Sequence, residues 1–122
     1  MRAIRAARLL AAGATWRLTG AATAAKALVD AVVSADETEQ TVAGMLLVRA
    51  GDRSVPPLTE ALLAGGSPDG PVEVLASIGT DAAKRALRRV AEATEPDVGA
   101  PSRESAAQAL RTLDEIDRRG HP

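Results

Sequence analysis

The chain has 122 residues, of which 46% are hydrophobic and 25% charged, and its net charge at pH 7 is −1. It contains no cysteine, which excludes disulfides and thiolate metal sites. A net charge of −1 gives the chain as a whole no electrostatic attraction to nucleic acid or to a membrane surface. Aromatic and β-branched residues, which favour strands, are sparse, whereas alanine is used wherever space is tight. The composition therefore predicts one all-α domain over 1–122.

The N-terminal part of the chain is predicted to form the first helix pair. Residues 1–12 combine basic and apolar side chains as a signal peptide does, but the apolar run is short and the helical pattern continues past Arg17. No segment has the roughly 20 apolar residues that a membrane-spanning helix needs. We therefore expect a soluble, cytoplasmic protein with no membrane span.

Three glycines define an internal repeat. Gly20, Gly51 and Gly79 each follow a large apolar residue by four positions and are 31 and 28 residues apart. Apolar residues recur four, seven and eleven positions after each glycine, which is the spacing of one buried helix face. The apolar positions are Trp16, Leu47 and Leu75 before the glycines, and Ala24, Ala27, Ala31, Val55, Leu58, Leu62, Ala83, Ala86 and Val90 after them. Each glycine is thus expected to end the first helix of a pair with a positive φ.

Capping residues indicate where several of these helices begin. Asp36 precedes the first helix of the second unit, and Ser54 precedes the second helix of that unit. Thr80 or Asp81 is the corresponding cap in the third unit. Side chains of these types accept hydrogen bonds from the free N–H groups of a helix start, so we expect Ser54 and either Thr80 or Asp81 to act as N-caps. Asp36 and Glu37 are expected to begin their helix because acidic side chains there favour the helix dipole.

Two breaker clusters separate the units, at 65–71 and at 94–102. Pro71 lies where the third unit should have a small helical residue, so we expect the first helix of that unit to be short. The second cluster is longer, and we expect it to be an extended, mobile connection.

The repeat ends in a half-unit. Leu110 and Leu113 match the apolar positions before a glycine, Asp114 stands where the glycine would be, and no second helix follows. The chain is therefore predicted to contain about three and a half helix pairs. The units are expected at about 3–34, 36–64, 71–93 and 103–116, followed by a tail over 117–122.

The second and last units resemble a known repeat. The stretch Thr-Val-Ala-Gly-Met-Leu-Leu-Val-Arg-Ala-Gly-Asp-Arg-Ser-Val-Pro-Pro-Leu, which starts at Thr41, is similar to the bacterial HEAT-like repeat first noticed in phycobilisome lyases. The stretch Arg-Glu-Ser-Ala-Ala-Gln-Ala-Leu, which ends at Leu110, is similar to the first helix of that repeat. The resemblance covers 35–116 well and 3–34 more loosely. It implies a right-handed α-solenoid whose second helices line a concave surface, and a general scaffold without lyase activity.

Catalytic and metal sites are not expected. The only histidine, His121, is too isolated to serve as a base or ligand, and the acidic clusters at 36–39 and 114–117 lie at helix ends, where they are solvated. The glycine-rich segments lack the Gly-Lys-Ser/Thr of a phosphate-binding loop. We therefore expect a non-enzymatic protein with no catalytic residue, no metal and no cofactor.

One surface is a candidate binding site. The basic residues Lys84, Arg85, Arg88 and Arg89 share one helix face, opposite the apolar stripe of 81–93. On the resemblance, this face would look into the groove beside Thr59, Glu60 and Lys26. A groove of mixed character suits a protein or peptide partner, which we expect, more than a uniform phosphate backbone.

Three alternatives stay open for this surface and for the chain. The basic face is a solvated helix surface without a partner, or it binds nucleic acid or another anionic ligand. In the third alternative the chain self-assembles as a homodimer through the uncovered apolar edge of the C-terminal helix.

Overall fold

The computed structural model describes residues 22–34 and 36–120, and every regular element in these ranges is helical. The elements are α2 (Ala22–Val32), α3 (Glu37–Ala50), the 3₁₀ helix η1 (Gly51–Ser54), α4 (Val55–Leu63), α5 (Asp69–Ile78), α6 (Asp81–Ala91) and α7 (Ala100–Gly120). The all-α prediction is confirmed for these residues. Trp16 and Gly20, with the first helix of the first unit, lie outside the described residues.

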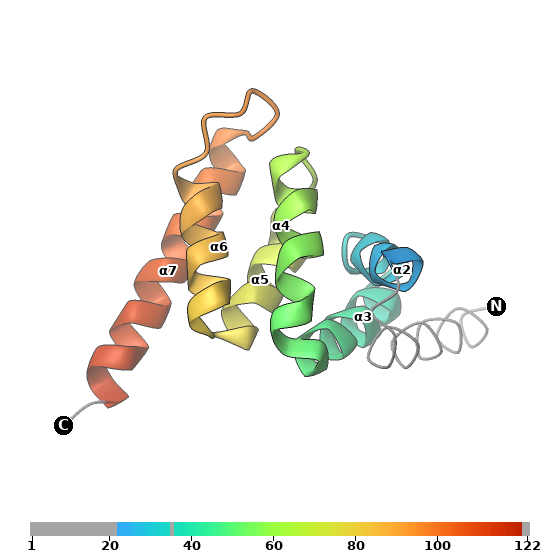
Figure 1. Ribbon diagram of the computed structural model, residues 1–122, viewed down its shortest axis with the longest axis horizontal. Coiled ribbons are helices and arrows are strands. Elements are labelled where there is room, and N and C mark those ends of the chain that lie inside the picture. The colour runs from blue at the N-terminus through green and yellow to red at the C-terminus, as the bar shows by residue number, and fades with distance from the viewer. Residues whose placement is uncertain (1–21, 35, 121–122) are drawn as a thin grey trace.

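The helices form two layers, each built from every second helix of the chain. In one layer α4 packs between α2 and α6, and in the other α5 packs between α3 and α7. Figure 1 shows α4 and α6 running side by side with α5 behind them, whereas α2 is seen nearly end on. The layers are joined because α2 packs on α3, α5 on both α4 and α6, and α6 on α7.

The core lies between the layers and consists mostly of leucine, valine and alanine. Leu47 and Leu75 are fully buried in the layer of α3, α5 and α7, and Leu58, Leu62 and Val90 are fully buried in the other layer. These are positions that the glycine-based alignment predicts to be apolar and buried. The hydrophobic effect on this stripe is what holds the layers together, at about 25 cal/mol per Å² of apolar surface removed from water.

The glycine-based alignment is wrong at one position of α2, although Ala31 is buried as this alignment predicts. It predicts a buried Ala27, but Ala27 is exposed and its neighbour Leu28 is fully buried. Burying a leucine side chain removes far more apolar surface from water than burying an alanine, so the larger residue determines which face of α2 turns inward.

The two described glycines of the repeat end helices as predicted. Gly51 follows α3 and Gly79 follows α5, both with φ of 64°, a conformation that side chains with a Cβ rarely adopt. Beyond Gly79, Thr80 caps α6 by accepting a hydrogen bond from the Ala83 N–H at 3.2 Å. The predicted start of α3 at Asp36 and Glu37 is also confirmed, and the Asp36 carboxylate accepts hydrogen bonds from two N–H groups of the first turn.

Ser54 does not cap α4, contrary to the sequence prediction. It has a helical conformation, and its buried hydroxyl donates a hydrogen bond to the carbonyl of Leu47. The last carbonyls of a helix lack partners within it, and the Gly51 N–H at the end of α3 bonds to Val48. Ser54 therefore satisfies the end of the preceding helix, while Pro56 and Pro57 occupy the start of α4, where N–H groups are not needed.

The prediction that Pro71 shortens a helix is confirmed by α5. This helix has 10 residues, against 14 in α3 and 21 in α7, and Pro71 lies in its first turn, where a missing N–H breaks no bond. At Gly70 the start of α5 approaches α2 closely. A Cβ added there would be 2.4 Å from the carbonyl oxygen of Val32, so only glycine fits at this contact.

The connection between α6 and α7 is not extended. The Val98 N–H donates to the carbonyl of Glu95 at 3.1 Å, which closes a turn, and the Val98 side chain is 2% exposed. Arg103 then donates to the carbonyl of Val98 at 2.7 Å. The prediction of an extended segment is therefore wrong, whereas its mobility stays a prediction.

The last helix is longer than its sequence pattern predicts. It begins at Ala100, within the expected connection, because Pro101 is tolerated in a first helical turn. It continues to Gly120, so residues 117–120 are helical and not a tail. The ion pair between Arg119 and Glu115 at 2.8 Å, four residues apart, and the basic side chains of the last turn favour this extension.

One hydrogen bond joins equivalent positions of successive units. Thr80 follows Gly79 directly, Asp52 follows Gly51 directly, and the Thr80 hydroxyl donates to Oδ1 of Asp52 at 2.6 Å. The two residues are 28 positions apart, which is the distance between the glycines. The turns after α3 and α5 are therefore neighbours in space.

Candidate functional site

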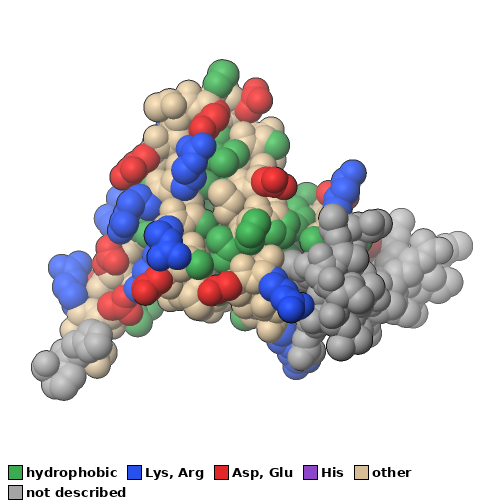
Figure 2. Space-filling view, viewed as in Figure 1, with side chains coloured by type: hydrophobic (Ala, Val, Ile, Leu, Met, Phe, Trp, Pro, Cys, Tyr) green, Lys and Arg blue, Asp and Glu red, His purple; other side chains and the backbone are tan. Residues whose placement is uncertain are grey.

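The basic residues predicted as a binding site lie on α6, whose two faces differ sharply. Ala83, Ala86, Leu87 and Val90 are buried against the neighbouring helices, and the cations project from the other side. Figure 2 shows lysine and arginine side chains gathered over and beside α6, on the face where α4 and α6 are seen. The sequence pattern therefore predicts correctly which side of the helix carries the charge.

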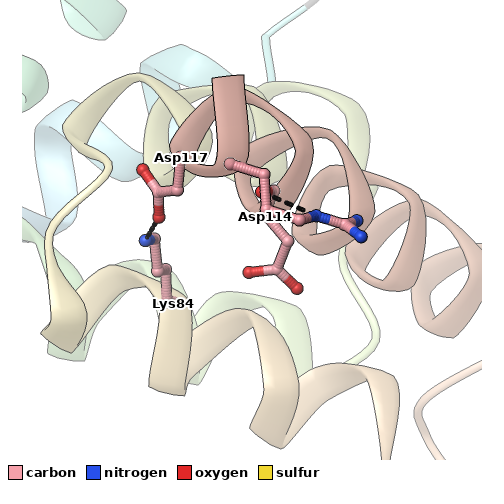
Figure 3. A network of polar contacts seen from close by, with 4 residues as sticks. Lys84, Asp114 and Asp117 are labelled. Atoms are coloured by element: carbon pink, nitrogen blue, oxygen red, sulfur yellow. Dashed lines mark hydrogen bonds and ion pairs between the residues drawn. The ribbon is translucent and has the colours of Figure 1, made fainter. Parts of the chain in front are cut away.

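Lys84 contacts the last helix and is not part of an open surface. Its ammonium group forms an ion pair with the carboxylate of Asp117 on α7, and its side chain is 20% exposed (Figure 3). The hydrogen bond that Lys84 donates to Asp117 raises the pKa of Lys84, and the negative charges of Asp117, Asp81 and Asp114 add to this effect. Because of this contact, Lys84 tethers α7 to α6.

Arg89 is also paired. Its guanidinium donates to both carboxylate oxygens of Glu95 in the α6–α7 connection, with Nη2 2.5 Å from Oε1. The pair raises the pKa of Arg89, and the hydrogen bond from Arg89 lowers the pKa of Glu95 below its usual value of 4.5. Arg89 therefore fixes the start of the connection.

The Arg89–Glu95 pair predicts a pH dependence. The pKa of Glu95 is lower in the folded chain than in the unfolded chain, so the stability from the pair is complete above the unfolded pKa and is lost as the pH falls through the folded pKa. In Arg89→Gln the pKa of Glu95, followed by carboxyl-selective NMR titration, should rise toward its usual value. In the control Arg85→Gln it should not change. The same pKa in wild type and Arg89→Gln would contradict the assignment.

Arg85 and Arg88 are the two basic residues of α6 that remain available to bind a partner. Both side chains are exposed, and neither forms a hydrogen bond or ion pair with any residue in 22–34 or 36–120. They are three positions apart, and residues at that spacing are neighbours on a helix surface. The basic site of four residues is thus reduced to two arginines without a partner in the described chain.

The three residues predicted to line a groove beside the basic face of α6 differ in how well they could contact a partner. Thr59 is half-buried, and its hydroxyl donates to the carbonyl of Val55 at 2.7 Å, so it is used within α4. Glu60 is exposed on α4, the helix beside α6. Lys26 is exposed on α2, on the far side of α4 from α6 (Figure 1). Of these three residues, Glu60 is therefore the exposed one on the helix next to α6.

The layer of α3, α5 and α7 carries a larger groove, which the sequence pattern does not predict. The α3–α5 groove encloses about 700 Å³ between those helices. Its apolar lining is Val32, Met45, Val48 and Val74, and its polar lining includes Gln40, Thr41, Arg49, Asp69, Glu73 and Ser77. Met45 is 55% exposed and borders this apolar lining.

A smaller groove of about 400 Å³ lies between α5 and α7. It is lined by Ala76, Ala109, Leu113 and Ile116 with several polar residues, and Ile116 is 57% exposed. Glu73 and Ser77 line both grooves, so α5 forms a ridge between them.

The signal that could have identified the α3–α5 groove is Met45. It lies two residues before Leu47, on a different face of the helix from the buried stripe, and it is one of two methionines in the chain. A flexible apolar side chain outside the stripe indicates a surface that binds apolar groups.

The part of the chain that the structure describes contains neither a metal site nor a membrane span. No group of three or more histidine, cysteine or acidic side chains is arranged to hold a metal ion there. In those same residues, no helix combines the length and the hydropathy needed to cross a membrane. Comparison with protein-family models, with curated proteins and with solved structures finds no match to this chain.

Proposed function

We propose that the protein is a non-enzymatic, cytoplasmic interaction module built as a right-handed solenoid of HEAT-like helix pairs. The proposal is that it binds an acidic segment of another protein, and the observation that carries it is the pair of exposed, unpartnered arginines on α6, Arg85 and Arg88.

The arrangement of the helices supports the solenoid. First helices of the expected pairs make one layer and second helices the other. The hydrogen bond between Thr80 and Asp52 links two turns that are one repeat apart. In a solenoid each unit contacts its neighbours in this way, and such proteins present extended surfaces for binding.

The charges on α6 support an acidic protein segment over nucleic acid. Nucleic-acid affinity grows with the number of cations that reach phosphates, and here Lys84 and Arg89 are already paired with carboxylates. Asp81 and Glu92 are exposed at the two ends of α6, where they would repel a continuous phosphate backbone. Two arginines can pair with two carboxylates and thereby select a short acidic motif.

The test is selection of peptides from a random display library, with the full-length chain as bait. We expect the enriched peptides to carry excess aspartate and glutamate. In the variant with Arg85→Glu and Arg88→Glu, the best of these peptides should bind about tenfold or more weakly, because two attractive charges become repulsive.

The matched control moves the same change to α7. Arg111→Glu with Arg119→Glu alters the net charge by the same amount, on two exposed arginines of another helix. It should leave peptide affinity unchanged. Enrichment of peptides without acidic character, or equal weakening by both double variants, would overturn the proposal, and tight binding of a thymidine oligonucleotide would favour the nucleic-acid alternative.

A further inference from the structure

We propose that the α3–α5 groove is a second binding site, which takes an amphipathic helix carrying basic residues beside its apolar face. This site lies in the other layer from Arg85 and Arg88 and does not depend on the function proposed for them.

The first argument is the shape of the groove. Two helices form its walls, and its volume of about 700 Å³ falls within the range of ligand-binding clefts. Between Thr41 and Val48 it follows α3 for about 10 Å, given a rise of 1.5 Å per residue. That length accommodates about two turns of a docked helix, which is enough for two or three anchoring side chains.

The second argument is the apolar lining. Val48 on α3 is half-buried, and Val74 on the opposite wall, α5, is buried. Met45 lines the same groove and is 55% exposed. An unbranched thioether side chain adapts to differently shaped partners, which is why methionine is common at surfaces that bind amphipathic helices. Gly44 adds room between the walls, since a Cβ there would approach Val74 to 3.8 Å.

The third argument is charge, and it determines the class of occupant. Asp69 and Glu73 line the groove on α5, are exposed, and have no ion pair or hydrogen bond with a residue of the described ranges. The wider segment 36–80 has seven acidic residues against Arg49 and Arg53, a net charge of −5. An occupant with lysine or arginine beside Asp69 and Glu73 is therefore favoured, and an acidic one is disfavoured.

The same charges indicate the direction of the occupant. Asp69 and Glu73 lie along the N-terminal part of α5, whereas Arg49 lines the groove from the C-terminal end of α3. The basic residues of the bound helix should face Asp69 and Glu73, and an acidic or neutral residue should face Arg49. A second copy docked through its α6 does not fit as well, because the basic face of α6 has no apolar side chain to fill the groove.

The probe is a labelled amphipathic peptide with leucines on one face and lysines beside them, together with a counterpart in which glutamate replaces each lysine. Binding to the full-length chain is followed by fluorescence anisotropy and by methyl NMR. We expect the lysine peptide alone to bind, and to shift the methyl signals of Met45, Val48 and Val74. Shifts confined to α6, or equal binding of both peptides, would overturn the proposal.

Charge reversal on the ridge gives a second test. Glu73→Lys should weaken binding of the lysine peptide about tenfold, since one attractive pair becomes a repulsive one. The control Glu60→Lys makes the same charge change on an exposed glutamate of α4, in the other layer, and should have no effect. If Glu73→Lys and Glu60→Lys weakened binding of the lysine peptide equally, the peptide would be responding to the net charge of the protein. That result would contradict a site in the groove.

Failure of this proposal can be told apart from failure of the α6 site. The double variant Arg85→Glu with Arg88→Glu should bind the lysine peptide as wild type does, because neither arginine lines the groove. Loss of lysine-peptide binding in that variant would place the peptide elsewhere and would overturn the groove as its site.

Discussion

Replacing Leu58 by alanine should lower the free energy of unfolding by about 2–5 kcal/mol, the range measured for fully buried leucines. Leu58 has no exposed surface, and its helix α4 packs on α2, α5 and α6. The substitution leaves a cavity at the centre of the contacts between the layers. Urea denaturation followed by circular dichroism measures the loss as a lower midpoint with an unchanged slope.

Ile116→Ala is the matched control for that experiment. It also removes a large aliphatic side chain from a helix, but Ile116 is 57% exposed on α7. We expect a change within about 0.5 kcal/mol, because little burial is lost and alanine favours helix. Equal losses for Leu58→Ala and Ile116→Ala would show that the core is not where the structure places it.

Gly70→Ala should also destabilise the fold strongly, although alanine normally favours a helix by about 1 kcal/mol over glycine. The new Cβ would lie 2.4 Å from the carbonyl oxygen of Val32, a backbone atom that cannot rotate away. The start of α5 must therefore shift away from α2. We expect a loss of about 1–3 kcal/mol or more, as in overpacked cores, measured by urea denaturation.

Gly44→Ala should change the free energy of unfolding in the opposite direction. Gly44 is inside α3, and a Cβ there would meet only Val74 Cγ2 at 3.8 Å, an ordinary contact. The substitution should stabilise the protein by about 0.5–1 kcal/mol through backbone entropy. A stabilising effect of Gly70→Ala would contradict the contact between α2 and α5, and a large loss in Gly44→Ala would contradict the spacing between α3 and α5 at Val74.

The features that the sequence predicts correctly are local or periodic. A helix start needs only a suitable side chain a few residues from free N–H groups, so Asp36 and Thr80 could be identified from their types. The buried leucines follow the spacing of one helix face, and Gly51 and Gly79 are needed where φ is positive. The exception, Ala27, arose because the alignment weighted position over side-chain size.

The features that could not be predicted depend on which distant groups meet. Ser54 has the type of an N-cap, but the free carbonyl of Leu47 lies within its reach and takes its hydrogen bond. Lys84 and Asp117 are 33 residues apart, and their contact follows from the packing of α7 on α6. Two of the four predicted basic residues, Lys84 and Arg89, are therefore paired within the chain, and a charge pattern does not reveal which charges are already paired.

The α3–α5 groove was missed for a related reason. A periodic pattern identifies the face of each helix that turns inward, but the space between two neighbouring helices depends on how closely their outer side chains pack. In the sequence Met45 indicates an exposed apolar position, but its relation to Glu73 is not visible there. Only the placement of α3 beside α5 shows that they border one hollow.

The length of α7 has a consequence for the motions of the chain. Its first half carries the buried Ser102 and Ala106, whereas residues 114–120 are all exposed and contact α6 through the partly exposed Lys84–Asp117 ion pair. Amide hydrogens in the second half should therefore exchange with solvent through local fraying, at rates that do not follow global unfolding. Those in the first half should exchange only when the layers separate. One continuous helix thus contains a rigid segment and a dynamic one, with the boundary near Leu113.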